Sequence, residues 1–129
     1  MCGKARVEKF VFPRVPIRME VPEGLPDIGQ LNSMAVVPML DRCEVFDGEV
    51  ELWGGYNLKI FYKPAADNSV NSVFSWELDK KFHTYAEFAG LKPGKKIQLQ
   101  PVIEKIDLEV TTPRSVKGSL TVAVDMKRV

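Results

Sequence analysis

The feature that most constrains this chain is a period-two pattern of large apolar residues between positions 50 and 62. Large apolar side chains occupy even positions, namely Val50, Leu52, Tyr56, Leu58, Ile60 and Tyr62. Successive side chains of a β-strand point to opposite faces of its sheet, so this period predicts a strand with one face in the core. Residues 74–82 and 116–126 repeat the pattern. The sequence therefore predicts an all-β protein.

Turn signals separate these segments. Asp47-Gly48 predicts a tight hairpin, and Thr112-Pro113-Arg114 predicts a second one. The pattern favours about seven to eight strands, arranged as an antiparallel β-sandwich or a partly open barrel with an extended N-terminal arm. A chain of 129 residues has the length of a single domain. We expect residues 1–33 to form the arm, as part of that domain, and residues 34–129 to form the sandwich core.

Four places depart from the regular strand pattern. We interpret Gly54-Gly55 as a bend that lets a long strand curve across the sandwich or pass from one sheet to the other. Across Pro101-Val102 the apolar set changes from odd to even positions, which predicts a bulge or bend there. Short helical turns are expected near residues 27–32 and 84–90, where a Pro-Asp start and a glycine end suit them.

Composition excludes several classes of protein. The 18 basic and 17 acidic residues give a net charge of +1, which provides no electrostatic basis for binding nucleic acid. The apolar runs are too short to span a membrane, and the first ten residues lack the apolar segment of a secretory signal. We therefore expect a cytoplasmic protein. Cys2 and Cys43 are too few for a disulfide framework and have no metal-ligand spacing, so ordinary thiols are expected.

No residue pattern indicates catalysis. His83 is the only histidine, and the alternation places Glu49 and Glu51 on a solvent face rather than in a cleft. The phosphate-binding loop, the dinucleotide-binding glycine motif and the nucleophile-elbow motif are all missing from the sequence. We therefore expect no catalytic residue, no metal and no cofactor, and we expect that the protein is not an enzyme.

Two aromatic side chains stand on the polar face of the strand at 50–62. Trp53 and Phe61 occupy odd positions among charged residues, which is typical of a surface that binds a partner. Val11 and Phe12 in the arm could cover that face or add a strand to a neighbouring molecule. The alternative is that both faces of the strand are buried within one domain. A small-molecule or glycan-binding cleft that uses Trp53, Trp76 and Tyr56 as stacking surfaces is a further alternative.

The sequence also resembles a known family, the SPOCS domain of proteins from Gram-positive spore formers. The run EVPEGLPDIGQL is followed about twenty residues later by DGEVELWGGYNLKIFY, as in that family. The matching residues are Pro26, Asp27, Ile28, Gly55, Leu58, Ile60 and Tyr62, followed by Phe82, Phe88, Gly90, Pro93 and Gly94. The similarity extends over residues 15–129, and its motifs are structural rather than catalytic.

The resemblance implies a scaffold that assembles or recruits spore-coat proteins. Family members include coat and cortex morphogenetic proteins, several of which join this domain to a peptidoglycan-binding LysM module. Since this sequence shows no LysM pattern, we expect a single-domain form that acts through its own surface. The expected partners are other copies of the chain, in a homo-oligomer or filament, and other coat proteins in the coat or cortex region. Membrane insertion is not expected.

Overall fold

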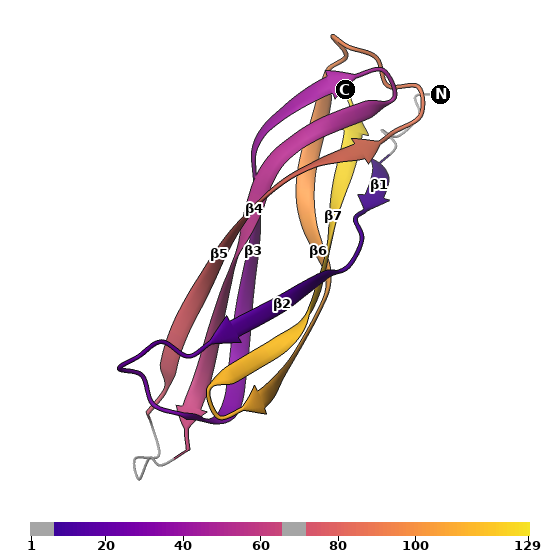
Figure 1. Ribbon diagram of the computed structural model, residues 1–129. Helices are drawn as coiled ribbons and strands as arrows, with labels where there is room; N and C mark the ends of the chain where they lie inside the picture. Colours follow the sequence, from indigo (N-terminus) through magenta and orange to yellow (C-terminus); the bar gives the residue numbers. More distant parts are fainter. Residues whose placement is uncertain (1–6, 66–71) are drawn as a thin grey trace.

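The computed structural model describes residues 7–65 and 72–129, and every regular element in these residues is a β-strand. Figure 1 shows the elements as two layers of long, twisted strands. The strands are β1 (Val7–Val11), β2 (Val15–Glu20), β3 (Ile28–Phe46), β4 (Glu49–Pro64), β5 (Phe74–Glu87), β6 (Ile97–Thr112) and β7 (Ser115–Arg128). The predicted all-β class and the predicted number of strands are confirmed.

The strands form two antiparallel sheets. In the three-stranded sheet, β4 lies between β3 and β5. In the four-stranded sheet, β6 pairs with one side of β7, while β1 and β2 pair with successive parts of its other side. Two sheets of this kind make a β-sandwich, so the first of the two predicted architectures is confirmed.

The N-terminal residues take part in this pairing. β1 and β2 are strands of the four-stranded sheet, and β3 begins at Ile28, before the expected end of the arm at residue 33. Residues 1–6, including Cys2, lie outside the described residues, whereas Cys43 is an exposed free thiol. The segment Phe12–Arg14 separates β1 from β2, and the Phe12 amide still donates to the Val122 carbonyl (2.9 Å). The arm thus continues along β7 as an interrupted edge strand.

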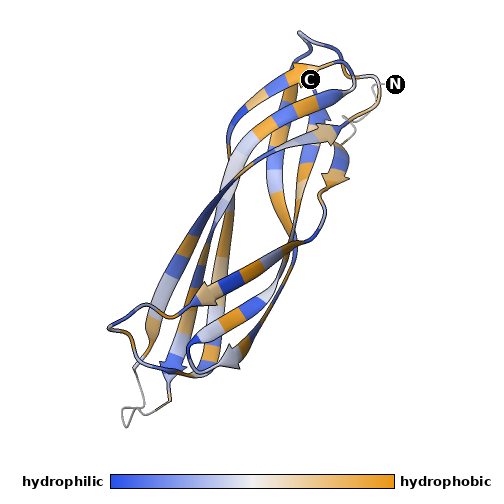
Figure 2. Ribbon diagram, in the orientation of Figure 1, coloured by the Kyte–Doolittle hydropathy of each residue, from blue (hydrophilic) through white to orange (hydrophobic). Residues whose placement is uncertain are grey.

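The hydrophobic core lies between the two sheets. All the even apolar residues of β4 are fully or almost fully buried, as predicted: Val50, Leu52, Tyr56, Leu58, Ile60 and Tyr62. They meet buried residues of the facing sheet, among them Ile17, Met19, Val116, Leu120 and Val124. In Figure 2 apolar and polar residues alternate along most strands, as expected when each strand presents one face to the core.

The turns follow the prediction. Phe46 pairs with Glu49, so Asp47-Gly48 closes a two-residue hairpin, and Gly48 has a φ of 77°, in the left-handed region that such turns require. Pro113-Arg114 closes the hairpin between β6 and β7. The bulge expected near Pro101-Val102 is present two residues further on, where the register shifts between Ile103 and Lys105.

The predicted helical turns are wrong, and one of the two alternatives for Gly54-Gly55 is wrong. The predicted helical turns at residues 27–32 and 84–90 are absent from the described residues, because these positions begin β3 and end β5. In addition, β4 does not pass from one sheet to the other at Gly54-Gly55. It stays paired with β5 without a register shift, and the bulge lies in β3, between Leu40 and Arg42. β4 curves and twists within its own sheet (Figure 1).

Candidate functional site

The outer face of the three-stranded sheet, which points away from the core, carries the predicted residue Trp53. Trp53 lies on the central strand β4, and its Cα partners are Arg42 on β3 and His83 on β5. Paired residues in antiparallel strands project to the same face, so three side chains form a row across the sheet. The next row contains Glu44, Glu51 and Tyr85 in the same way.

The row around Trp53 is a stack of planar groups. The Arg42 guanidinium carbon is 3.8 Å from the indole centroid, a cation–π geometry. The His83 ring is stacked on the indole, with centroids 4.8 Å apart and planes 9° apart. Because β3 and β5 flank β4 on opposite sides, these two residues cover opposite faces of the indole. Neither indole face is left open for stacking on a sugar ring.

Glu51 joins this stack to Tyr85. Its side chain is only 13% exposed, although it lies on the outer face. One carboxylate oxygen, Oε2, is 2.5 Å from His83 Nε2 and accepts a hydrogen bond from the Tyr85 hydroxyl at 3.1 Å. We call Arg42, Glu51, Trp53, His83 and Tyr85 together the Trp53 cluster. These contacts hold the side chains of the cluster in defined positions on the outer face of the sheet.

The hydrogen bond to Glu51 raises the pKa of Tyr85, and the negative charge of the same carboxylate adds to the effect. We predict that the Glu51→Gln variant lowers the pKa of Tyr85 toward the ordinary tyrosine value, because the amide keeps an acceptor but removes the charge. The measurement is a pH titration of the Tyr85 ring signals by NMR. Glu87→Gln, which removes a carboxylate from the same face of β5, is the control and should leave the titration unchanged.

Phe61 lies on the same face but away from the cluster. Eight residues, or about 27 Å of strand, separate it from Trp53 along β4. Between them Asn57 donates hydrogen bonds to Asp79 (2.8 Å) and Glu77 (3.2 Å), so polar contacts interrupt the apolar surface. The Lys59 ammonium lies 5.4 Å from the centroid of the Phe61 ring. The structure therefore places the two aromatic residues at separate positions on one face.

The two predicted residues of the arm lie in the other sheet. Val11 is 50% exposed at the end of β1, opposite Ala123 of β7. Phe12 turns inward, with its ring 5.2 Å from that of Phe10 and 6.4 Å from that of Phe82. The structure does not bring Val11 and Phe12 onto the Trp53 face. Their role, like that of Trp53 and Phe61, in binding a partner stays a prediction.

The side chains of the Trp53 cluster lie on an open sheet face rather than in a cleft. His83 and Glu51 form a single imidazole–carboxylate pair on an open sheet face, whereas acid–base catalysis needs such a pair beside a bound substrate. Among the described residues there is no group of three or more potential metal ligands. The described residues also contain no helix long and apolar enough to cross a membrane.

Part of this cluster follows from the sequence. A two-residue hairpin at Asp47-Gly48 fixes the register of the flanking strands, and that register places Arg42 opposite Trp53 and Glu44 opposite Glu51. His83 and Tyr85 are different, because the connection between β4 and β5 has no tight turn that would set the register. The sequence interpretation treated His83 and the carboxylates separately and missed their contact.

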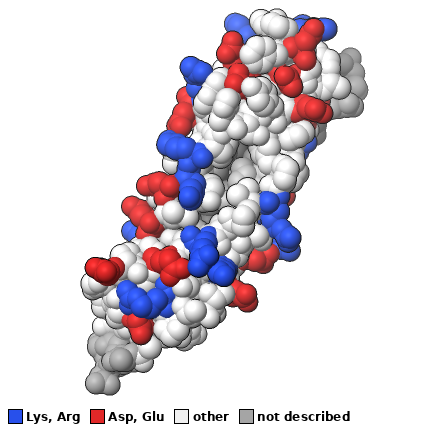
Figure 3. Space-filling view, in the orientation of Figure 1, with Lys and Arg blue, Asp and Glu red and all other residues white. Residues whose placement is uncertain are grey.

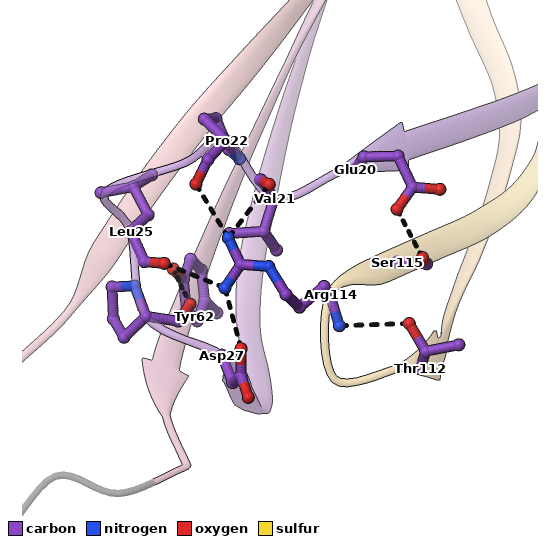
Figure 4. A network of polar contacts seen from close by, with 10 residues as sticks. Glu20, Val21, Pro22, Leu25, Asp27, Tyr62, Thr112, Arg114 and Ser115 are labelled. Atoms are coloured by element: carbon purple, nitrogen blue, oxygen red, sulfur yellow. Dashed lines mark hydrogen bonds and ion pairs between the residues drawn. The ribbon is translucent and has the colours of Figure 1, made fainter.

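The Pro-Asp-Ile stretch has a structural role, shown in Figure 4. The Tyr62 hydroxyl donates to the carbonyl of Pro26 at 2.7 Å, and Ile28 is buried in the core. The Asp27 carboxylate accepts a hydrogen bond from Arg114 at 2.8 Å, where the β6–β7 hairpin meets the start of β3. These motif residues hold the sandwich together at one end.

Further motif residues also serve the fold. Leu58 and Ile60 are in the core, and so is Phe88 near the other end of the sandwich. Gly90 and Gly94 have positive φ in the connection between β5 and β6. The fold and the site thus define a class of protein: an antiparallel β-sandwich whose motifs are structural and whose exposed features suit binding.

Comparison with known families identifies the family within that class. Residues 27–111, which are 85 of the 129 residues, match the family model described as SipL, SPOCS domain. The chain therefore belongs to the SPOCS domain family, as its sequence indicates. That family is one of non-catalytic structural and interaction domains. No match to a curated protein or to a solved structure was found.

Proposed function

We propose that this protein is a non-enzymatic structural protein of sporulation that associates with other copies of itself through the Trp53 cluster. Membership of the SPOCS family supports the setting, since the family has a sporulation-related role in protein–protein contacts. Other coat-type proteins are the second kind of partner. Within this proposal the protein acts in the spore coat or cortex region by assembly rather than by turning over a substrate.

The observation that carries the proposal is the Arg42–Trp53–His83 stack. Tryptophan, tyrosine and arginine are the residues that contribute most often to binding energy at protein interfaces. Here all three types lie in adjacent rows of one sheet face, and their contacts with each other hold them in place before a partner arrives. Side chains that are already ordered lose little conformational entropy on binding, which favours association.

The charges on this face support a second copy as the partner. Arg42 on β3 is followed two positions later by Glu44, so cationic and anionic side chains stand side by side on the same edge of the sheet. A twofold contact places the same patch of both subunits face to face, and it can then join each Arg42 to a Glu44 of the other copy. Phe46, an exposed aromatic residue at the end of β3, extends the apolar area.

The test is the mass of the purified protein in solution. We expect the wild-type chain to form oligomers in light-scattering and electron-microscopy measurements, and Trp53→Glu to weaken association by at least about tenfold, or about 1.4 kcal/mol. The introduced carboxylate would lie beside Arg42 and His83, so the monomer should remain folded. Val129→Glu, at the most exposed apolar residue in the described part of the chain, is the matched control and should assemble normally.

Two results would contradict the proposal. One is a wild-type protein that stays monomeric at millimolar concentration and also fails to bind purified coat-type proteins. The other is a Trp53→Glu variant that assembles like the wild type. Phe61→Glu tests whether the interface extends along β4: an effect equal to that of Trp53→Glu would mean that the whole outer face is covered.

A further inference from the structure

The sandwich has a groove along one side, where the two sheets do not close on each other. One wall is β5, the edge strand of the three-stranded sheet. The other is the segment Phe12–Pro16, made of the connection after β1 and the first two residues of β2. The groove has a volume of about 500 Å³. It corresponds to the hollow in the middle of the face shown in Figure 3. Tyr56, on the inner face of β4, lines it, so the groove and the Trp53 cluster lie on opposite faces of the same sheet.

The floor of the groove is apolar and its rim is cationic. Phe12, Phe82 and Val122 supply apolar surface from both sheets, and Arg14, Lys80 and Lys81 supply positive charge from both walls. No aspartate or glutamate is among the described residues that line it. In Figure 3 the uncharged hollow lies between basic side chains on its two sides. A ligand that fits this surface carries apolar groups and negative charge together.

Two of the three cationic side chains of the rim form no ion pair or hydrogen bond within the described residues. Lys81 forms an ion pair with Asp41, with Nζ and Oδ2 3.0 Å apart. Arg14 and Lys80, in contrast, have no ion pair or hydrogen bond from their side chains to any other part of the described chain. Lys80 occupies an even position of β5, between Leu78 and Phe82 on the face of the strand that points to the core. An apolar residue would be expected at this position.

Tyr56 adds a third available donor. Its side chain is almost entirely buried and burial raises its pKa, yet its hydroxyl has no hydrogen-bond partner within residues 7–65 and 72–129. The hydroxyl is not one of the fully buried polar atoms, so it is accessible from the groove and can donate a hydrogen bond to a bound ligand. All three uncommitted groups of the groove are donors, so the ligand must provide acceptors, and carboxylates are the acceptors that also match the charge.

The edge of β5 supplies a further binding element. β5 pairs with β4 on one side, and no other strand of the described residues pairs with its free side. An unpaired strand edge presents alternating N–H and C=O groups to any extended chain that lies beside it. A peptide can use these groups together with the groove, whereas a small carboxylic acid cannot. The groove is therefore matched to a segment of polypeptide.

We propose that this groove binds an extended, acidic and apolar segment of another protein, which adds to β5 as a strand. In this complex the apolar side chains of the segment cover Phe12 and Phe82, and its carboxylates bind Arg14 and Lys80. The site is separate from the Trp53 cluster, so it does not depend on self-association. It gives a SPOCS domain a second way to recruit a partner while its outer sheet face remains free.

The test uses a labelled peptide, Thr-Glu-Thr-Phe-Thr-Glu-Thr, which places its phenylalanine and both glutamates on one face of the added strand. Its binding is measured by fluorescence anisotropy with the full chain. We expect saturable binding that weakens as salt is added, and no binding of the peptide in which lysine replaces each glutamate. The double variant Arg14→Gln/Lys80→Gln should bind at least tenfold more weakly. The matched control, Lys95→Gln/Lys96→Gln, removes the same charge from the β5–β6 connection and should bind like the wild type.

Amide hydrogen exchange locates the peptide. We expect it to protect backbone amides of β5 near Lys80, because they become hydrogen bonded to the added strand. The same peptide with N-methyl groups on alternate amides should bind poorly. The proposal is overturned if the acidic peptide does not bind at millimolar concentration, if the control variant loses as much affinity, or if protection appears on another strand. In those cases Lys80 only guards an edge strand against aggregation.

Discussion

The Gly55→Ala variant should lower the free energy of unfolding by about 3 kcal/mol, which corresponds to a fall in Tm of roughly 10 °C. A Cβ atom built on Gly55 would lie 2.2 Å from the carbonyl oxygen of Lys80, far inside van der Waals contact. The neighbouring atom belongs to the backbone of β5 and cannot rotate away as a side chain would. To admit the methyl group, β4 and β5 must separate where their ladder is continuous. Chemical denaturation measures the loss.

Gly54→Ala should lower the free energy of unfolding by a similar amount, because its added methyl group would collide with β3, the neighbour on the other side of β4. Its Cβ would lie 2.3 Å from the carbonyl oxygen of Met39 on β3. The control is Gly24→Ala, where no atom lies within 4 Å but φ is +92°, so only the cost of the left-handed backbone applies, about 1 kcal/mol. If Gly55→Ala costs no more than Gly24→Ala, the strands are not held at the close approach described here.

This close approach explains why the sequence interpretation of Gly54-Gly55 was only partly right. Adjacent glycines in an alternating strand indicate that something unusual happens there, and curvature of the strand was one of two expectations. The cause lies in the partner strands, since the bulge is in β3 and the nearest carbonyls belong to Met39 and Lys80. A pattern within one strand cannot show which neighbour comes close. The alternative, a change of sheet, therefore had equal standing in the sequence.

The main features of the fold were predictable because they depend on local signals. Period-two alternation identified the buried face of β4, and Asp47-Gly48 identified the β3–β4 hairpin. The helical turn at residues 27–32 was wrong because tertiary contacts outweigh local preference there. The Asp27 carboxylate binds Arg114 instead of capping a helix, and the Ile28 amide donates to the carbonyl of Pro113 at 2.7 Å. Nothing within the segment itself indicates these partners.

The candidate sites also contain some contacts that the sequence could predict and others that it could not. The Arg42–Trp53 contact follows from the hairpin register, whereas His83 and Tyr85 enter the cluster through pairing across a longer connection. The groove depends on the segment Phe12–Arg14 lying opposite β5, although about 70 residues of chain separate them. Such a long-range arrangement has no local sequence signal. Only Lys80, a charged residue in an apolar row, hinted that the inner face of β5 is open at that point.

The Arg114→Ala variant should lower the free energy of unfolding by about 2 kcal/mol, because charged hydrogen bonds are among the stronger polar contacts and these are partly exposed. Arg114 joins the β6–β7 hairpin to the segment before β3 (Figure 4). Nη1 donates to the Leu25 carbonyl (3.0 Å) and to Asp27 Oδ1 (2.8 Å). Nη2 donates to the carbonyls of Pro22 (2.9 Å) and Val21 (3.2 Å).

Arg114→Lys should recover little of this stability, because one ammonium group cannot reach acceptors that a planar guanidinium spans. Arg18→Ala is the control: its side chain contacts Glu20 at 3.5 Å on an exposed surface, so its loss should cost less than about 1 kcal/mol. Amide exchange should rise in both Arg114 variants at residues 21–28, while the backbone bond from the Val21 amide to the Arg114 carbonyl remains. If Arg114→Lys is as stable as the wild type, then the positive charge alone holds residues 21–28 in place, and the several N–H donors of the guanidinium are not needed. Arg114 lies beyond the family match at residues 27–111. The same experiment therefore tests whether the turn of the β6–β7 hairpin is needed to stabilise the part of the domain that matches the family.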